Sequence, residues 1–194
     1  EVRDGRLAHN SRLGNLRDAG DPAELALRYA SEGADEIIFM DASESPDGRR
    51  QLLELVGRTA QHLFIPLTVG GGINEVADIA LMLRAGADKI TINTGGVRRP
   101  ELISEAVVRF GKQCVIASID ARVEKRQIEL VARTEGPQGA APQTQQTVTS
   151  AALTPKPGTG FRVYTNGGRN APDLDAIAWA RQCAALGAGE ILAT

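Results

Sequence analysis

The chain has 194 residues, of which 42% are hydrophobic and 24% are charged, and its formal net charge is −2 at pH 7. This length and balance fit one globular domain. The sequence has no basic run that would suggest nucleic acid as a partner, and no apolar stretch approaches the roughly 20 residues that a membrane helix needs.

Short apolar runs alternate with segments of helical period along most of the chain. The opening "EVRDGR" is typical of a strand end followed by a turn. Asp21 is the expected N-cap of the first helix, with Pro22 at its first helical position. The apolar runs are nearly continuous, as in parallel strands that are covered on both faces. Strands are predicted at 36–41, 65–70, 89–94, 114–120 and 190–194, and helices at 21–33, 48–63, 74–86, 99–111 and 173–187.

An internal repeat favours one α/β architecture. Residues 24–40 and 175–194 each read as a helix, then Gly-Ala-x-Glu-Ile, then an apolar strand, and 81–94 is a looser third copy. Such repeated units predict a (β/α)8 TIM barrel built from two similar halves. In this register, residues 1–194 are a single incomplete barrel domain that runs from the end of strand 1 to strand 6, without strands 7 and 8. An open doubly wound sheet is the alternative, but it does not explain the repeat.

Residues 123–160 break this pattern. They are rich in Pro, Gln, Thr, Ala and Gly and show no period. This composition predicts a flexible, low-complexity insertion at the surface, away from the chemistry.

Two glycine-containing loops follow neighbouring predicted strands. Gly70, Gly71 and Gly72 in "PLTVGGGI" allow a sharp turn, and their backbone N–H groups lie beside a helix start, which favours an anion site. Asn93 and Thr94 in "TINTGG" add an amide and a hydroxyl at the next strand end. The simpler alternative is a tight turn without a ligand. The sequence has no GxxxxGK[ST] motif, so it gives no support for nucleotide hydrolysis.

Carboxylates at strand ends are the candidate acid and base. Asp120 ends the fifth strand and Glu1 falls at the end of the first, so the two would face each other across a barrel mouth. Asp41, after another strand, is expected to line the same mouth. A structural role as a cap or hydrogen-bond acceptor remains the alternative for Asp120.

Metal chemistry finds little support in the sequence. Cys114 and Cys183 lie in apolar patterns, which indicates buried free thiols in a cytoplasmic protein. His9 and His62 lie far apart with no cysteine cluster nearby, so we expect no zinc site.

Several motifs together resemble a known enzyme family. "NLRDAGDPAELA", "ADEIIFMDASES", "PLTVGGGI", "RAGADKITINT", "RPELISEAVVRFG", "CVIASIDAR" and "GAGEILAT" look like the cyclase subunit of imidazole glycerol phosphate synthase, from histidine biosynthesis. The resemblance spans nearly the whole chain outside 123–160. It implies a lyase, without cofactor or metal, that pairs with a glutaminase subunit as a heterodimer. Ammonia from the glutaminase would cross the barrel to a ribulosyl aminoimidazole carboxamide ribonucleotide that carries two phosphates.

The resemblance also assigns roles to residues of this chain. Asp120 matches one of two acid–base aspartates, while Glu1 stands where the family has the other. Gly72, Asn93 and Thr94 match one phosphate site, and Thr194 matches a substrate contact. Lys89 and Glu190 match charged residues near the ammonia entrance and the partner.

Two further functions stay open at this point. The first is the isomerase of the same pathway, which acts on the related aldose ribonucleotide and shares "VGGGI". The second is a degenerate barrel that binds phosphate without turnover, which Glu1, His9 and Asn10 motivate because the family has Asp and a Lys-Gly pair there.

Overall fold

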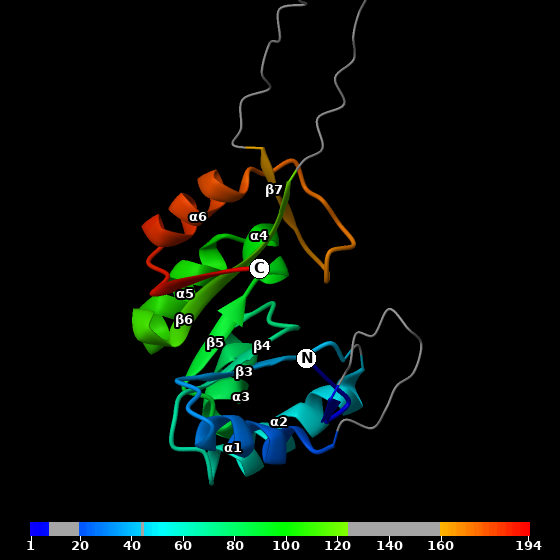
Figure 1. Ribbon diagram of the computed structural model, residues 1–194. Coiled ribbons are helices and arrows are strands. Elements are labelled where there is room, and N and C mark those ends of the chain that lie inside the picture. Colours follow the sequence, from blue (N-terminus) through cyan, green and yellow to red (C-terminus); the bar gives the residue numbers. More distant parts are fainter. Residues whose placement is uncertain (8–19, 44, 124–159) are drawn as a thin grey trace, which may run out of the picture.

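A computed structural model describes residues 1–7, 20–43, 45–123 and 160–194 (Figure 1). The main sheet has six strands, in the order β3-β4-β5-β6-β7, with β8 paired to β6. Its strands are β3 (Ile37–Met40), β4 (Leu67–Gly70), β5 (Lys89–Ile92), β6 (Val115–Val123), β7 (Phe161–Tyr164) and β8 (Glu190–Ala193). A separate two-stranded hairpin joins β1 (Val2–Arg3) and β2 (Arg6–Leu7).

The parallel strands follow the chain order. β3, β4, β5 and β6 are parallel neighbours in sequence, and β8 continues the series on the other side of β6. Val2 forms a parallel bridge to Asp41, so the start of the chain lies beside β3, as expected for the end of a first barrel strand. The doubly wound alternative requires a reversal of strand order, and the described strands have none. The result is an α/β fold with a curled, half-barrel sheet.

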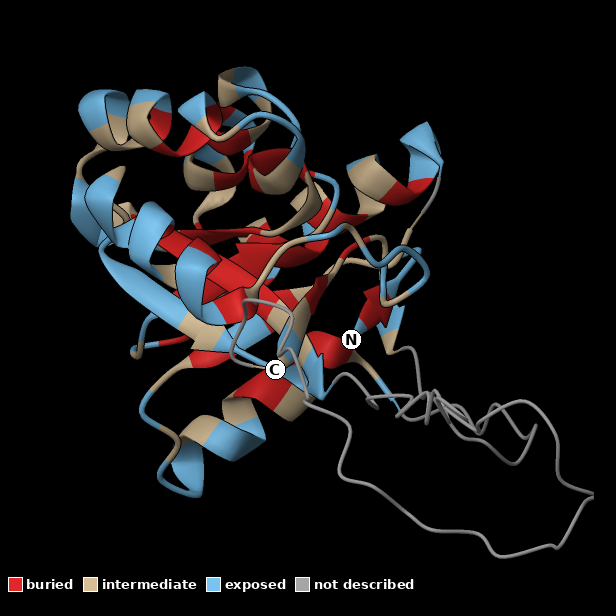
Figure 2. Cartoon of the chain, turned by 90° about the horizontal axis from the view of Figure 1, so that it is seen from above, coloured by how far each residue is buried: buried red, intermediate tan, exposed pale blue. Residues whose placement is uncertain are grey.

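Helices connect these strands and cover one face of the sheet (Figure 1). Leu67, Val69, Ile90 and Ile92 belong to one hydrophobic cluster with helix residues such as Leu52. Alternate strand residues face the other side, where Thr68, Thr91 and Ser118 are buried polar groups. Figure 2 shows the strands largely buried on the inner side of helices whose outward sides are exposed. The helices are α1 (Pro22–Ser31), α2 (Pro46–Ala60), α3 (Val76–Ala85), α4 (Thr94–Arg98), α5 (Glu101–Phe110) and α6 (Ala176–Ala185), with a 3₁₀ turn at Lys112–Cys114.

Helix ends confirm the local sequence signals. The Asp21 side chain accepts a hydrogen bond from Ala23 N–H, and Pro22 opens α1. Gly86 has φ 119° at the C-cap of α3, a left-handed conformation that glycine adopts without steric cost. Within the described ranges, no helix is long and apolar enough to cross a membrane.

Three features differ from the sequence expectations. β6 continues to Val123, three residues beyond the predicted end at Asp120, because Asp120–Val123 pairs antiparallel with β7. β7 itself had no sequence prediction. Thr94, predicted as the end of a strand, begins the short helix α4. The predicted insertion otherwise falls on 124–159, outside the described residues.

Candidate active site

Several predicted site residues lie at one edge of the sheet. The parallel register aligns Met40 with Gly70 and Gly70 with Thr91, and it aligns Ile119 with Ala193. The carboxyl ends of these strands therefore meet, as the carboxyl ends of parallel barrel strands do. Gly72, Asn93, Thr94, Asp120 and Thr194 all sit at this carboxyl edge, and Asp41 follows β3 there.

The glycine turn after β4 has structural reasons for each of its glycines. A Cβ on Gly70 would collide with Thr91 Oγ1, and one on Gly71 would collide with the Asp41 carbonyl. Gly71 and Gly72 have φ of 98° and 61°, which favours glycine. The Arg49 side chain, from α2, donates to the carbonyls of Gly71 and Gly72. The tight turn itself thus accounts for part of the reason that three glycines stand here. The carbonyl groups of Gly71 and Gly72 already accept hydrogen bonds from Arg49.

Asn93 and Thr94 mark the end of β5. Asn93 Oδ1 is buried and has no hydrogen-bond partner among the described residues. Thr94 Oγ1 accepts a hydrogen bond from Asn166 N–H at 3.0 Å. A buried acceptor without a donor is rare in proteins, so Asn93 is a position where a ligand donor would satisfy the structure.

Asp120 and Thr194 are in direct contact. The Thr194 hydroxyl donates to Asp120 Oδ1 at 2.5 Å. The backbone holds the same junction, since Thr194 N–H donates to Ile119 O at 3.1 Å and Ala121 N–H donates to Thr194 O at 2.8 Å. This arrangement fixes one carboxylate oxygen of Asp120 at the mouth of the half-barrel.

Glu1 and Asp41 lie at the other side of the same edge. Glu1 is exposed and directly precedes Val2, which bridges to Asp41. Asp41 Oδ1 accepts a hydrogen bond from Ser43 N–H at 2.9 Å. No hydrogen bond joins Glu1 to Asp120 in the part of the chain that the structure describes. Glu1 directly precedes β1, beside β3, whereas Asp120 lies in β6, so these two carboxylates are on opposite sides of the carboxyl edge.

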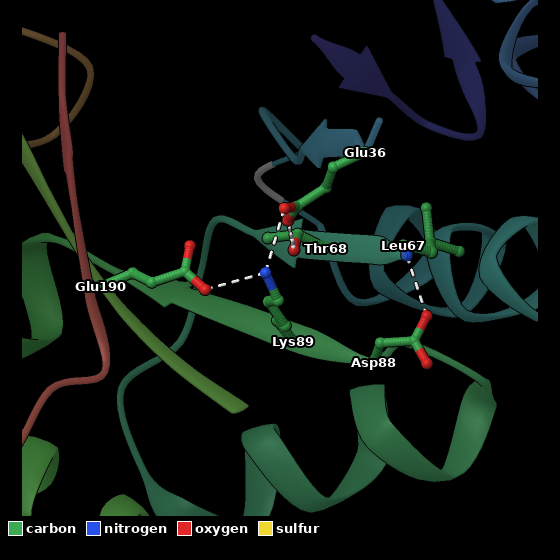
Figure 3. Close-up of polar contacts among 6 residues, drawn as sticks. All are labelled: Glu36, Leu67, Thr68, Asp88, Lys89 and Glu190. Carbon is green, nitrogen blue, oxygen red and sulfur yellow. Dashed lines mark hydrogen bonds and ion pairs between the residues drawn. The ribbon is translucent and has the colours of Figure 1, made fainter. Parts of the chain in front are cut away.

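A charged cluster occupies the opposite, amino edge of the sheet. Lys89 Nζ lies 2.8 Å from Glu190 Oε1 and 3.0 Å from Glu36 Oε2 (Figure 3). Thr68 Oγ1 donates to the other oxygen of Glu36. Below them, Leu67 N–H donates to Asp88 Oδ2 at 2.9 Å. The structure thus brings Lys89 and Glu190 together and adds Glu36 and Thr68 to them.

These contacts favour the charged forms of Glu36 and Lys89. Burial raises the pKa of Glu36, but hydrogen bonds from Thr68 and Lys89 outweigh it, so the pKa lies below its ordinary value. Hydrogen bonds to Glu190 and then to Glu36 raise the pKa of Lys89. Both directions favour the ion pair between Lys89 and Glu36.

The internal repeat explains this cluster, although sequence reasoning missed Glu36. The three copies read "GADEI" at 33–37, "GADKI" at 86–90 and "GAGEI" at 187–191. Their fourth positions are Glu36, Lys89 and Glu190. Each copy ends a helix and starts a strand, so parallel pairing brings the fourth positions to one level. Alignment of the three copies in the sequence would have identified Glu36 as the counterpart of Lys89 and Glu190.

Arg49 and Asn166 also escaped the sequence reasoning. Arg49 lies in a predicted helix where no local pattern distinguishes it, and only the tertiary structure brings it to the glycine turn. Asn166 begins the "NGG" of a turn, a recognisable hairpin signal, and its φ of 53° is left-handed.

The chain is similar to known proteins along its whole length. A family described as "Histidine biosynthesis protein" matches residues 1–194. The chain is 48% identical over 194 residues to the imidazole glycerol phosphate synthase subunit HisF of Methanopyrus kandleri, covering 100% of this chain and 66% of the relative. For the subunit of the same name from Corynebacterium diphtheriae, the identity is 45% over 192 residues, with coverage of 99% and 64%. The Myxococcus xanthus subunit is 46% identical over 194 residues, with coverage of 100% and 64%. The chain therefore spans 64% to 66% of the length of these curated relatives.

Proposed function

The chain belongs to the histidine biosynthesis protein family, and from this premise we propose that it is the cyclase subunit of imidazole glycerol phosphate synthase. In this proposal a glutaminase subunit supplies ammonia. The cyclase then converts a ribulosyl aminoimidazole carboxamide ribonucleotide into imidazole glycerol phosphate and aminoimidazole carboxamide ribonucleotide. The enzyme is a cytoplasmic lyase that uses no cofactor.

One observation carries the proposal: the candidate acid–base, phosphate and substrate residues share the carboxyl edge of consecutive parallel strands. Asp120 and Thr194 are hydrogen-bonded there, at the ends of adjacent strands. Active sites of parallel α/β barrels lie at this edge. We take the parallel strands β3, β4, β5, β6 and β8 as successive strands of an eight-stranded barrel, whose mouth is this edge.

Asp120 is the proposed general acid or base. Its carboxylate is positioned by Thr194 and lies on the mouth side of the sheet. Glu1 is the second carboxylate, in the position where the family carries Asp. Its carboxyl is one methylene further from the backbone, and a misplacement of about 1 Å costs up to roughly 100-fold in rate. We therefore expect Glu1→Asp to raise kcat.

Gly72, Asn93 and Thr94 form the proposed cradle for one substrate phosphate. The Asn93 amide nitrogen and the Thr94 hydroxyl are suitable donors to phosphate oxygens. Asn93 Oδ1, which has no partner among the described residues, would accept from a substrate hydroxyl. If the Asn93 nitrogen donates to the phosphate while its oxygen accepts from the hydroxyl, the side chain fixes the orientation of the sugar relative to its phosphate.

The amino edge is the proposed entrance for ammonia and the docking side of the glutaminase. Lys89, Glu190 and Glu36 stand at the start of three strands there (Figure 3). Behind them, Thr68, Thr91 and Ser118 supply buried polar groups on the face away from the helices. Ammonia is a small polar molecule, so such a lining suits its passage.

The decisive experiment offers two substrates to the complete protein. The cyclase hypothesis predicts that imidazole glycerol phosphate forms from the ribulosyl ribonucleotide only when ammonia, or glutamine with the glutaminase, is present. Conversion of the aldose ribonucleotide without ammonia would favour the isomerase of the same pathway. Asp120→Asn is the control, with an expected loss of about 10²–10⁴-fold in kcat. A protein inactive in both assays, even with Glu1→Asp, would contradict both enzyme hypotheses.

A further inference from the structure

A pocket lies outside the residues used so far, beside the carboxyl edge. It has a volume of about 520 Å³ and opens between α4 and the loop that follows β7. This volume is within the range of small-molecule sites. The residues that line it are Val97, Arg98, Thr165, Arg169, Asn170, Ala171 and Pro172.

We propose that this pocket binds a small phosphomonoester, as an anion site separate from the cradle at Gly72. Arg98 and Arg169 both line it, and the described lining residues include no carboxylate. Guanidinium forks match phosphate oxygens in geometry as well as in charge. The Asn170 side chain supplies a further amide donor.

The remaining wall indicates that the ligand has an organic part. Val97, Ala171 and Pro172 are apolar and belong to the same lining as the two arginines. Inorganic phosphate would leave this wall in contact with water, whereas a sugar or similar group attached to the phosphate would cover it. A phosphomonoester of sugar size therefore fits the pocket better than the free ion.

Asn166 connects this pocket to the proposed phosphate cradle. Its backbone N–H donates to Thr94 Oγ1 at 3.0 Å, while its Oδ1 accepts from Arg98 Nη2 at 3.5 Å. The second contact is at the long limit for a hydrogen bond, so a bound phosphate would compete for Arg98 easily. Thr94 begins α4 and Arg98 ends it, so one short helix carries a residue of each site.

An NMR titration of the complete protein with ribose 5-phosphate tests the pocket. The backbone amide of Ala171 reports on the pocket and that of Gly72 on the cradle. We expect the Ala171 signal to move and saturate, and ribose without phosphate to leave it in place. Arg98→Gln should weaken the response at Ala171 by about 10–100-fold, the effect of one lost charged hydrogen bond. Asn170→Asp, which adds a carboxylate to the pocket and keeps both arginines and the Ala171 amide, should weaken it similarly.

Arg99→Gln is the matched control. Arg99 is the adjacent residue, it pairs with Glu105 at 2.6 Å, and it is absent from the pocket lining. The proposal is overturned if Ala171 stays fixed while Gly72 moves, if ribose alone acts equally, or if Arg98→Gln binds like the unaltered protein. A substrate with two phosphates separates the two sources of ligand. One shared saturation curve for both amides identifies the pocket as a subsite of the substrate, and two independent curves identify a separate effector site. The titration reads binding alone, so its result is independent of the ammonia assay.

Discussion

Thr194 Oγ1 donates to Asp120 Oδ1 at 2.5 Å, at the point where β8 ends beside β6. The hydroxyl holds one carboxylate oxygen of Asp120, and in the proposed function the other oxygen contacts the substrate. If Asp120 transfers protons, the orientation of its carboxylate depends on the Thr194 side chain.

Thr194→Val tests that dependence. The substitution keeps the shape of the side chain but removes the hydroxyl, so we expect kcat to fall by about tenfold, the effect of one neutral-to-charged hydrogen bond. Thr194→Ser keeps the hydroxyl and should retain most of the rate. The measurement is steady-state turnover with saturating ammonia. Equal rates for the Val and Ser variants would exclude a positioning role for the hydroxyl.

Lys89→Met tests the charged cluster at the amino edge. The substitution leaves Glu36 and Glu190 without their shared cation, so we expect a loss of about 1 kcal/mol in the free energy of unfolding, a modest value because the groups are partly exposed. Arg28→Met is the control. The Arg28–Glu32 pair is an exposed pair within one helix, with side chains 62% and 60% exposed, and should contribute a few tenths of that value. Urea denaturation measures both.

The pH dependence of the same cluster has a definite sign. The pKa of Glu36 is lowered by folding, so its stabilisation is complete above the ordinary value of 4.5 and is lost as the pH falls below it. The pKa of Lys89 is raised, so its stabilisation is complete below the ordinary value of 10.5 and is lost as the pH rises through the folded value. The difference in unfolding free energy between the unaltered protein and Lys89→Met should therefore be flat at intermediate pH and shrink at both extremes. A difference that grew in acid would contradict these directions.

Gly71→Ala separates crowding from backbone strain at the glycine turn. Gly71 has φ 98°, and a Cβ there would collide with the Asp41 carbonyl. Gly33 has a similar φ of 101°, but a Cβ there would meet no atom within 4 Å. We expect Gly33→Ala to cost about 1 kcal/mol from strain alone, and Gly71→Ala to cost about 2–4 kcal/mol. Equal thermal shifts for the two variants would show that crowding is absent.

The two cysteines should differ in reactivity. Burial raises the pKa of Cys183 to about 11, and the residue is fully buried, whereas Cys114 is partly exposed. Since the thiolate is the reactive form, a disulfide reagent at pH 8 should label Cys114 in the folded protein and Cys183 only after unfolding. Cys114→Ser should remove the fast phase. Fast labelling of Cys183 in the folded state would contradict the burial.

The parallel part of the fold was predictable because its signals are local and repeated. Apolar runs such as 65–70 and the Asp21-Pro22 cap depend on neighbouring residues alone, and their predictions hold. The hypothesis of two buried thiols is wrong for Cys114, which lies in the turn before β6 and remains partly exposed. The burial of single residues at element ends depends on packing rather than on the local pattern.

The unpredicted elements depend on tertiary contacts. α4 contains Gly95 and Gly96, which have poor helix propensity. Gly95 is needed there because a Cβ would collide with the Ile73 carbonyl. β7 is a four-residue strand whose place depends on its pairing with β6 and on its contacts with the segment that leads into α6. At the site, parallel pairing accounts for the shared carboxyl edge, but the contacts of Arg49 and Asn166 arise from segments that no local pattern connects.

The last rung of the antiparallel ladder, Val123 with Phe161, has a consequence for protein engineering. The chain leaves this antiparallel pair at Val123 and rejoins it at Phe161, so residues 124–160 connect two positions that are themselves paired. The entropic cost of holding the two ends of a connecting segment together varies slowly with the length of the segment. Shortening or replacing this segment, or fusing a reporter into it, should therefore leave Asp120 in place, since Asp120 is paired with Tyr164 three positions away from the end of the antiparallel pair.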